Sequence, residues 1–289
     1  MTVRMAAVLG SPIEHSKSPL LHQAAYKELG LDWEYEKFEV KAAELKPFLD
    51  RLDSTWAGLS LTMPLKEEAL RLATDVSEMA QRTGGANTLV STGGEWIAHN
   101  TDVAGMIFAI EQGRRGQGVD LGEPVQSATV LGTGATARSA IAALAAMSPQ
   151  VKLQVAGRTL ANVEQIVGWA KNDLGVEVTG VALQDSRQVA LDSQIVVSTI
   201  PANGVEDLAA HVSESPKVLV DVVYDPPTNQ LAKAWVEHGG ARVGGLTMLV
   251  AQAAEQVRLM TGYEGPLEPI REAMFTALAD SGIAVDDIR

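Results

Sequence analysis

Short apolar runs and longer amphipathic segments take turns along the chain. Apolar runs of about four to eight residues predict strands, and apolar positions spaced three and four apart predict helices that bury one face. In the first hundred residues we expect strands at 3–9, 33–40 and 58–61 and helices at 19–29, 42–52 and 64–73. We also expect a hairpin from 87–91 and 96–98, because Gly93 and Gly94 separate these two runs.

The alternation resumes after residues 112–126, a segment rich in Gly and charge that we predict to be a loop. We expect strands at 128–131, 151–156, 195–199, 218–222 and 241–243 and helices at about 135–147, 246–260 and 270–280. Strands that alternate with helices indicate an α/β fold in which helices cover the sheets. We predict an N-terminal α/β substrate-binding domain at 1–105, completed by 246–289, and a doubly wound Rossmann-type domain at 106–245, with a cleft between them.

The segment 128–137, Ala-Thr-Val-Leu-Gly-Thr-Gly-Ala-Thr-Ala, joins a strand to a helix through a glycine turn. Gly132 suits the tight turn, Gly134 lets the backbone approach a pyrophosphate, and the small Ala137 permits close packing of helix on strand. The helix N-terminus presents free N–H groups and a positive dipole to the phosphates. We therefore predict a dinucleotide site that also includes Thr133, Ala135 and Thr136; the alternative is a glycine-rich connector with no ligand.

The end of the next strand, 151–156, distinguishes between the two nicotinamide cofactors. A site selective for NAD usually has Asp or Glu here to bind the ribose 2′-hydroxyl, but no acid occurs before Glu164. Arg158 stands there instead, and a guanidinium matches the geometry of a 2′-phosphate. This predicts NADP rather than NAD, although a lone surface arginine would have no such meaning.

Composition excludes several other classes of function. The chain has 289 residues, a net charge of −13 and no cysteine, which argues against a nucleic-acid partner, disulfides and thiol catalysis. The five histidines (15, 22, 99, 211 and 238) show no metal-ligand spacing, so we expect no metal. No apolar run approaches about 18 residues, and the first ten residues lack the pattern of a signal peptide, so we expect a cytoplasmic protein without a membrane partner.

Polar groups near the start of the chain suggest a site for an anion. We expect Ser18 to be the N-cap of the first helix and Pro19 its first residue. The hydroxyls of Ser16 and Ser18, together with the helix N-terminus, could bind a substrate carboxylate. The alternative is that both serines are structural and that one of them only caps the helix.

Lys66 and three further polar residues are candidates for the chemistry. Lys66 falls in the first turn of a predicted helix, where the helix dipole disfavours a cation. Asn87, Asn100 and Asp102 cluster near the predicted domain boundary, and ligands commonly bind at such boundaries. The alternatives are an ordinary exposed lysine and polar side chains that satisfy their own backbone in turns.

Taken together, these segments resemble the shikimate dehydrogenase family. The matching motifs are Ser-Pro-Ile-x-His-Ser-x-Ser-Pro-x-x-His at 11–22, Leu-Thr-Met-Pro-x-Lys at 61–66, Ala-Asn-Thr-Leu at 86–89 and Asn-Thr-Asp-x-x-Gly at 100–105. The resemblance continues through 132–137, 158–159, 198–201, 221–226 and 245–253. The motifs follow one another in order over nearly the whole chain, which makes the set much more specific than any one of them.

The resemblance implies reversible reduction of 3-dehydroshikimate to shikimate by NADPH, a step toward chorismate and the aromatic amino acids. It assigns Ser16 and Ser18 to the substrate carboxylate, and Lys66 and Asp102 to the oxygen that reacts. Other substrate contacts implied by the resemblance are Ser60, Thr62, Asn87, Gln252 and Tyr224. Further cofactor contacts implied by it are Thr199, Pro201, Val222, Gly245 and Met248.

The chain departs from the family pattern at two positions. Ser60 stands where the family often has Asn, which shortens one polar contact, and Asn162 stands where a second basic residue often follows Arg-Thr. The resemblance then leaves the 2′-phosphate to Arg158, Thr159 and Asn162, which weakens the preference for NADP. Quinate or an aminated analogue is therefore an alternative substrate. A dinucleotide-binding regulatory module without turnover is a further alternative, but it would not need both Lys66 and Asp102. We expect a monomer or a homodimer.

Overall fold

A computed structural model of the chain describes residues 3–185 and 187–284. These residues form two compact units, each built on one six-stranded sheet. Unit 1 contains the chain up to Asp102 and again from Val250, and unit 2 contains Val103–Leu249. The predicted α/β class is confirmed.

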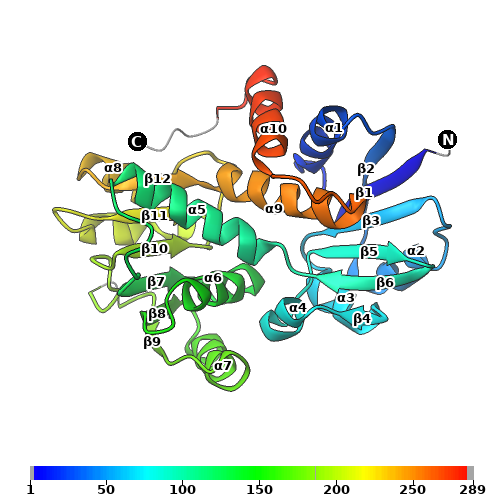
Figure 1. The fold of residues 1–289 in the computed structure, drawn as a ribbon. Coiled ribbons are helices and arrows are strands. Elements are labelled where there is room, and N and C mark those ends of the chain that lie inside the picture. The colour runs from blue at the N-terminus through cyan, green and yellow to red at the C-terminus, as the bar shows by residue number, and fades with distance from the viewer. Residues whose placement is uncertain (1–2, 186, 285–289) are drawn as a thin grey trace. The chain divides into compact units, whose positions relative to one another are not determined.

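The sheet of unit 1 is mixed and has the strand order β2-β1-β3-β5-β6-β4 (Figure 1). Its strands are β1 (Arg4–Gly10), β2 (Trp33–Glu39), β3 (Trp56–Leu61), β4 (Asp75–Val76), β5 (Thr88–Thr92) and β6 (Glu95–His99). β1 runs parallel to β2 and β3, whereas β5 runs antiparallel to β3 and β6, as the predicted hairpin requires.

This topology gathers several chain segments at one edge of the sheet. At the start of β5, Thr88 pairs with Ser60 near the end of β3 and with His99 at the end of β6. Leu9, near the end of β1, pairs with Leu61. The residues that follow β1, β3 and β6 therefore lie on the same edge as the residues that precede β5.

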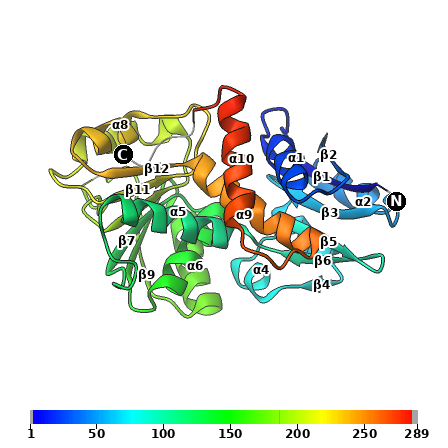
Figure 2. The same ribbon diagram turned by 45° about the horizontal axis from the view of Figure 1, so that its top comes forward.

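Helices cover both faces of this sheet. Leu59 and Leu61 point to the face of the sheet opposite to Ser60. There they belong to a buried apolar cluster that also contains Leu65 and Ala69. The helices of unit 1 are α1 (Ser18–Glu28), α2 (Leu45–Leu49, after a 3-10 turn at Ala42–Glu44), α3 (Lys66–Leu72), α4 (Glu78–Thr83), the second part of α9 (Gly245–Thr261) and α10 (Glu268–Asp280). α1 and α10 lie side by side (Figure 2).

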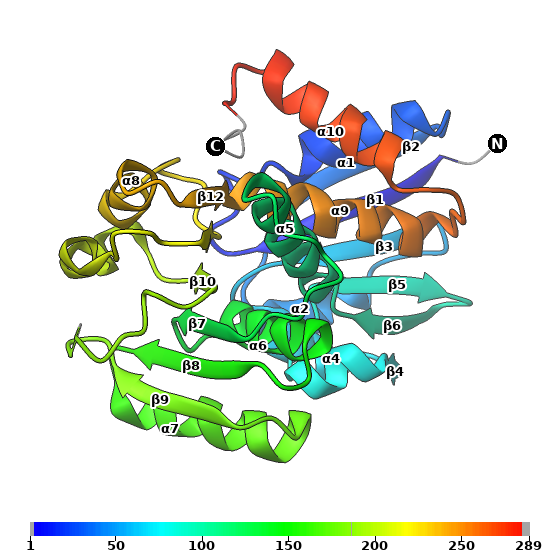
Figure 3. The ribbon, with the colours of Figure 1, turned by 60° about the vertical axis from the view of Figure 1, so that its left-hand side comes forward.

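The sheet of unit 2 is entirely parallel, with the order β12-β11-β10-β7-β8-β9 (Figure 3). The strands are β7 (Ser127–Leu131), β8 (Lys152–Gly157), β9 (Val178–Ala182), β10 (Ile195–Ser198), β11 (Val218–Asp221) and β12 (Ala241–Gly244). The order reverses between β7 and β10. In a doubly wound sheet this topological switch point, at the carboxyl ends of the strands, is where ligands bind.

The helices of unit 2 connect these strands or flank them in the chain. They are α6 (Ala135–Met147), α7 (Leu160–Trp169), α8 (Gln230–Glu237), most of α5 (Asp102–Gly116) and the first part of α9, with shorter turns at Ala170–Leu174, Ala202–Gly204 and Glu206–His211. In the described part of the chain, no helix has the length and apolar character needed to span a membrane.

Two predictions about local structure are wrong. Residues 112–116 of the predicted loop belong to the end of α5. Gly113 lies in this helix because a side chain there would collide with Val218 and Val243. Ser18 is not an N-cap: α1 begins at Ser18 itself, after Lys17, and Pro19 is its second residue. The prediction omitted β4, α4, α5, α7, β9 and α8.

Candidate active site

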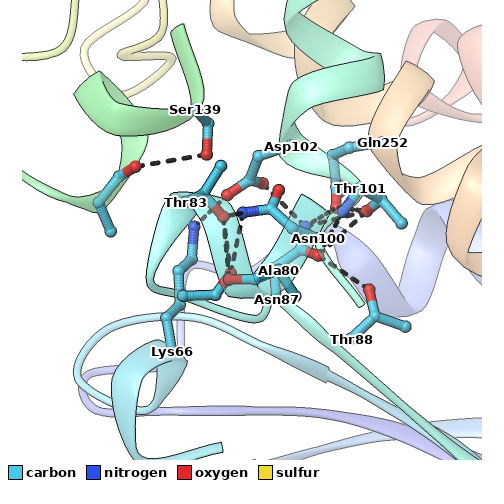
Figure 4. A network of polar contacts seen from close by, with 12 residues as sticks. Lys66, Ala80, Thr83, Asn87, Thr88, Asn100, Thr101, Asp102, Ser139 and Gln252 are labelled. Atoms are coloured by element: carbon cyan, nitrogen blue, oxygen red, sulfur yellow. Dashed lines mark hydrogen bonds and ion pairs between the residues drawn. The ribbon is translucent and has the colours of Figure 1, made fainter. Parts of the chain in front are cut away.

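A lysine and an aspartate from different segments form a partly buried ion pair at the edge of the unit 1 sheet (Figure 4). Lys66 is the first residue of α3, which follows β3, and Asp102 is the first residue of α5, which follows β6. Lys66 Nζ donates to Asp102 Oδ2 over 2.5 Å, and the two side chains are only 15% and 8% exposed. The pair combines a proton donor with a carboxylate that orients it.

Asn87 holds the other oxygen of this carboxylate. Its Nδ2 donates to Asp102 Oδ1 over 2.8 Å, and its Oδ1 accepts from the backbone N–H of Thr101 over 2.8 Å. A backbone N–H can only donate and a carboxylate can only accept, so the orientation of the Asn87 amide follows from its partners. Asp102 is thereby held from both sides.

Gln252 of α9 joins the same cluster. Asn87 Nδ2 lies 3.1 Å from Gln252 Oε1, and the side chain of Gln252 is buried. The structure therefore brings together four of the predicted residues, Lys66, Asn87, Asp102 and Gln252. Asn100, which the sequence analysis grouped with them, instead donates to Thr83 Oγ1 and the Gly85 carbonyl at 2.9 Å each, and so ties two turns together.

The two serines of the predicted carboxylate site lie at the start of α1. Ser16 Oγ accepts from the N–H of Ser18 over 3.3 Å, while the Ser18 side chain is buried. Thr62 is partly exposed directly after β3. A partly exposed hydroxyl, a buried hydroxyl and the amino end of a helix are suitable groups for a carboxylate.

Ser60 is buried, and its contacts are with protein groups that the sequence analysis did not identify. Its Oγ accepts from the Tyr35 hydroxyl over 2.6 Å and donates to Oε1 of Gln256 over 2.8 Å. Gln256 lies four residues after Gln252 on α9, so the helical spacing could have pointed to it. Tyr35 alternates with polar residues in a strand, and no sequence signal distinguishes it from an ordinary core tyrosine.

His22 packs against this group from α1. Its ring stacks on Tyr35 with 3.9 Å between centroids, and Nδ1 lies 2.9 Å from the Ser18 carbonyl. Burial lowers the pKa of His22 from 6.5 to about 4, although the hydrogen bond with Ser18 opposes the shift. Burial also raises the pKa of Tyr35, so both rings are neutral near pH 7.

In unit 2, the turn after β7 has the features that a pyrophosphate requires. Gly132 has φ +117°, and the Thr199 hydroxyl occupies the space that a side chain there would need. Gly134 is the N-cap of α6, is exposed, and has no described atom within 4 Å of the position of an added Cβ. The first turn of α6 carries no acidic side chain that would repel an anion.

The remaining residues of this turn fit a dinucleotide as well. Ala137 is fully buried where α6 packs on the sheet, whereas Thr133, Ala135 and Thr136 are partly exposed. Thr199 follows β10, the strand next to β7, and its hydroxyl donates to the Leu131 carbonyl over 2.8 Å. Both strand ends belong to the switch point, where the fold favours binding of such a ligand.

Arg158 follows the end of β8, as predicted. Its side chain is exposed, and its carbonyl accepts from Gln184 Nε2 over 2.7 Å, which holds the backbone of the turn. Thr159, which is the N-cap of α7, follows it directly, and Asn162 lies in the first turn of this helix. Both residues are exposed. These residues offer a guanidinium, a hydroxyl and an amide to a phosphate.

The other predicted residues of unit 2 follow the next strands. Pro201 is exposed after β10, and Val222 and Tyr224 are partly buried after β11. Gly245 has to be glycine, because a side chain would collide with the Val222 carbonyl. Met248 is buried on α9.

Two family models and several known proteins match this chain. The model of the shikimate dehydrogenase substrate binding domain matches residues 8–89, and that of the shikimate 5′-dehydrogenase C-terminal domain matches residues 245–275. The chain is 32% identical to shikimate dehydrogenase (NADP(+)) of Methanosarcina mazei, with 94% of this chain and 97% of that protein covered.

Solved structures are similar over nearly the whole chain. Mycobacterium tuberculosis shikimate dehydrogenase has 38% identity and a TM-score of 0.84, with 96% and 99% of the two chains covered. Thermus thermophilus shikimate 5-dehydrogenase, solved with NADP(H) and shikimate, has 30% identity, a TM-score of 0.77 and coverage of 96% and 100%. Corynebacterium glutamicum quinate dehydrogenase, solved with NAD, has 27% identity, a TM-score of 0.81 and coverage of 95% and 99%.

Proposed function

The chain belongs to the shikimate dehydrogenase family, and we propose that it interconverts 3-dehydroshikimate and shikimate with NADP(H) on the way to chorismate and the aromatic amino acids. It is then an NADP-dependent oxidoreductase that acts on a CH–OH group. The observation that carries the proposal is the ion pair of Lys66 and Asp102, oriented by Asn87. A non-catalytic binding module would not require these three groups to converge.

Substrate binding falls to hydroxyl and amide groups of unit 1. The hydroxyls of Ser16 and Ser18, with the N-terminus of α1, bind the carboxylate. Thr62, Asn87 and Gln252 bind the ring hydroxyls or the carboxylate, and we also assign Tyr224, from unit 2, to the substrate side. Ser60, which the resemblance implied as a substrate contact, is bonded to Tyr35 and Gln256 instead. Asn87 has the donors and acceptors for this task because a neutral amide offers both.

Unit 2 binds the cofactor, whose nicotinamide ring when bound supplies or accepts the hydride. The turn Gly132–Ala137 holds the pyrophosphate, and Arg158, Thr159 and Asn162 bind the 2′-phosphate. Thr199, Pro201, Val222, Gly245 and Met248 complete the set of residues that we assign to the cofactor.

Lys66 moves the proton. Reduction of a ketone leaves an alkoxide, which the Lys66 ammonium protonates; in the oxidation direction the neutral amine removes the same proton. Asp102 holds Nζ in position and offsets its charge, while the N–H of Asn87 keeps the carboxylate from turning away.

Quinate is a second candidate substrate, because the similar Corynebacterium enzyme is a quinate dehydrogenase and Ser60 is smaller than the family's usual Asn. Quinate carries one more hydroxyl, at the carbon that bears the carboxylate. An unpaired buried hydroxyl costs about 1–3 kcal/mol. We therefore expect shikimate to be preferred.

The test is the absorbance of NADPH formed by the purified protein from shikimate with NADP⁺. Quinate and NAD⁺ are then substituted in turn, and each combination gives its own kcat/KM. We expect the highest kcat/KM for shikimate with NADP⁺. The absence of turnover with shikimate contradicts the proposal, and comparable kcat/KM with quinate makes the chain a dual-substrate enzyme.

We also propose a cytoplasmic enzyme that is a monomer or a homodimer. The absence of cysteine from the sequence supports a location where disulfides play no part. Sedimentation equilibrium gives the number of chains in the particle, and fractionation of cells that express the protein gives its compartment.

A further inference from the structure

Gln256 is a buried glutamine of α9 that is 1% exposed and has all its polar atoms paired. Nε2 donates to the carbonyl of Asn87 over 3.0 Å and to Thr88 Oγ1 over 3.1 Å, and Oε1 accepts from Ser60 over 2.8 Å. A buried amide destabilises the fold when its N–H or oxygen has no hydrogen-bond partner. The Gln256 amide is therefore held in the orientation in which its nitrogen faces acceptors and its oxygen faces a donor.

The carbonyl of Asn87 determines that orientation. A carbonyl oxygen only accepts hydrogen bonds, so the atom that faces it is Nε2, and Oε1 must face Ser60. Ser60 has one hydroxyl hydrogen and gives it to Oε1. The Tyr35 hydroxyl, 2.6 Å from Ser60 Oγ, must then be the donor in its hydrogen bond with Ser60.

The same reasoning continues from Gln256 to the ion pair. Thr88 Oγ1 receives a hydrogen from Gln256 and donates its own to Asn87 Oδ1 over 2.9 Å. The N–H of Thr101 also donates to Oδ1, which identifies this atom as the oxygen. Asn87 Nδ2 therefore points to Asp102 Oδ1, over 2.8 Å.

We call this series the donor chain: Tyr35, Ser60, Gln256, Thr88, Asn87 and Asp102. Every member donates toward the next, and the series ends on the carboxylate whose other oxygen accepts from Lys66. Hydrogen bonds aligned in one direction polarise and strengthen one another. All six residues belong to unit 1.

We propose that Gln256 is a positioning residue for the reaction: it holds Asn87, by its carbonyl and through Thr88, so that the Asn87 amide fixes Asp102 for Lys66. This role rests on the proposed function. Ser60 and Tyr35 belong to the same support, because the hydrogen of Ser60 is committed to Gln256. Ser60 acts on the reaction through this support and does not donate to the substrate.

The first test compares Gln256→Met with Met260→Ala. Methionine keeps the length of the side chain but makes none of its hydrogen bonds. We expect kcat for shikimate to fall about 10- to 100-fold, as misplacement of a reacting group does, with KM changed less than about threefold.

Met260 is the matched control. It lies one turn further along α9 and packs against Gly58, outside the donor chain. Met260→Ala removes packing of the same helix on the same sheet, and we expect its kcat to stay within about twofold of wild type. If both variants lose kcat equally, or if Gln256→Met keeps wild-type kcat, the proposal is wrong.

Ser60→Ala is a milder variant in case Gln256→Met does not fold. We expect it to lower kcat about three- to tenfold with KM unchanged, since the hydrogen bonds of Ser60 with Tyr35 and Gln256 are lost but those of Gln256 with Asn87 and Thr88 remain. A raised KM with wild-type kcat would overturn the proposal, because it would show that Ser60 contacts the substrate.

A crystal structure of Gln256→Met separates this proposal from the proposed function. The Asn87 amide is expected to turn or move away from Asp102, whatever the substrate is. An amide that keeps its contact with Asp102 overturns the positioning role even if the wild-type enzyme oxidises shikimate. If the wild type does not oxidise shikimate but the amide moves, only the proposed function fails.

Discussion

The hydroxyl of Thr199 occupies the place where a side chain at Gly132 would have to lie. Thr199 donates from both its N–H and its hydroxyl to the Leu131 carbonyl, each over 2.8 Å, so it is fixed against the end of β7. Gly132 also has φ +117°, a value that residues with a side chain rarely adopt. The packing of the residues that follow β7 and β10 thus requires glycine at position 132, whether or not a ligand binds there.

We therefore expect Gly132→Ala to destabilise unit 2. The backbone conformation alone costs about 1–3 kcal/mol, and the collision with Thr199 adds to it. The free energy of unfolding, measured by urea denaturation, should fall by at least this amount. An unfolding free energy equal to that of wild type would show that neither the positive φ nor the hydroxyl of Thr199 requires glycine at this position.

Gly134→Ala is the matched substitution two residues away. At Gly134 φ is −84°, and an added Cβ meets no described atom within 4 Å, so stability should fall by no more than about 1 kcal/mol. The affinity for NADP⁺, measured by fluorescence titration, should nevertheless fall about tenfold, because the backbone can no longer approach the pyrophosphate closely. Unchanged affinity would place the pyrophosphate elsewhere.

Arg158→Ala should abolish the preference for NADP⁺. A charge-assisted hydrogen bond contributes about 1.5–3 kcal/mol, so kcat/KM with NADP⁺ should fall roughly 10- to 100-fold, while kcat/KM with NAD⁺ changes little. Lys152→Ala is the control, since it removes one positive charge from the opposite end of β8. If the two variants have the same effect, the preference comes from overall charge and not from Arg158.

Much of this architecture follows from the hydrophobic pattern. Most strands are short apolar runs, so β1, β7 and β10 lie within a residue or two of their predicted positions. α5 was missed although Val103, Met106 and Ile110 are spaced for a helix and buried, because glycines within the segment suggested a loop. The packing reason for Gly113 depends on Val218, more than a hundred residues away in the sequence.

The candidate site was predictable only in part. Lys66, Asn87, Asp102 and Gln252 lie in motifs, and the structure brings all four together. Tyr35 and Gln256 do not stand out in the sequence, because a single buried polar residue looks the same whether or not it has partners. Their importance depends on which donor faces which acceptor, and only the folded arrangement of β2, β3 and α9 determines that.

Acid should destabilise the protein through His22. Its pKa is lowered from 6.5 to about 4 in the folded state, mainly by burial. The unfolded chain then binds more protons than the folded one between these two values. The contribution of neutral His22 to stability is therefore complete above the unfolded pKa and is lost as the pH falls toward the folded one.

Between about pH 7.5 and pH 5, this loss should amount to about 2 kcal/mol of unfolding free energy. His22→Phe keeps a ring against Tyr35 but does not titrate. Urea denaturation gives the unfolding free energy of each protein at both pH values. Between pH 7.5 and pH 5 this free energy should decrease less for His22→Phe than for wild type, by about that amount, whatever the absolute stability of the variant. Equal decreases in the two proteins would show that His22 is not the group responsible.

Removal of the hydroxyls at Ser16 and Ser18 should weaken substrate binding and leave the chemical step intact. A carboxylate contact is made equally in the ground and transition states, so Ser16→Ala/Ser18→Ala should raise KM for shikimate about tenfold or more, with kcat nearly unchanged. Ser91→Ala, in the hairpin of β5 and β6, is the control. A native KM in the double variant would mean that both serines are only structural.

Lys66→Met tests the mechanism most directly. Lys66 Nζ is held by Asp102, whose other oxygen is held by Asn87, and in the proposed function this ammonium protonates the alkoxide. Loss of one general acid–base group typically lowers the rate about 10²–10⁴-fold. We expect this decrease in kcat, with a much smaller change in the Kd for shikimate, because methionine retains the length of the side chain.

Two control measurements accompany the test of Lys66→Met. Binding of NADPH by Lys66→Met, followed by fluorescence, should match wild type and shows that unit 2 is intact. Lys46→Met removes an exposed lysine of α2 that is paired with Asp50, and it should leave kcat unchanged. If Lys66→Met instead keeps kcat within a few-fold of wild type while binding both ligands, another group transfers the proton, and the ion pair with Asp102 serves only to hold α3 and α5 together.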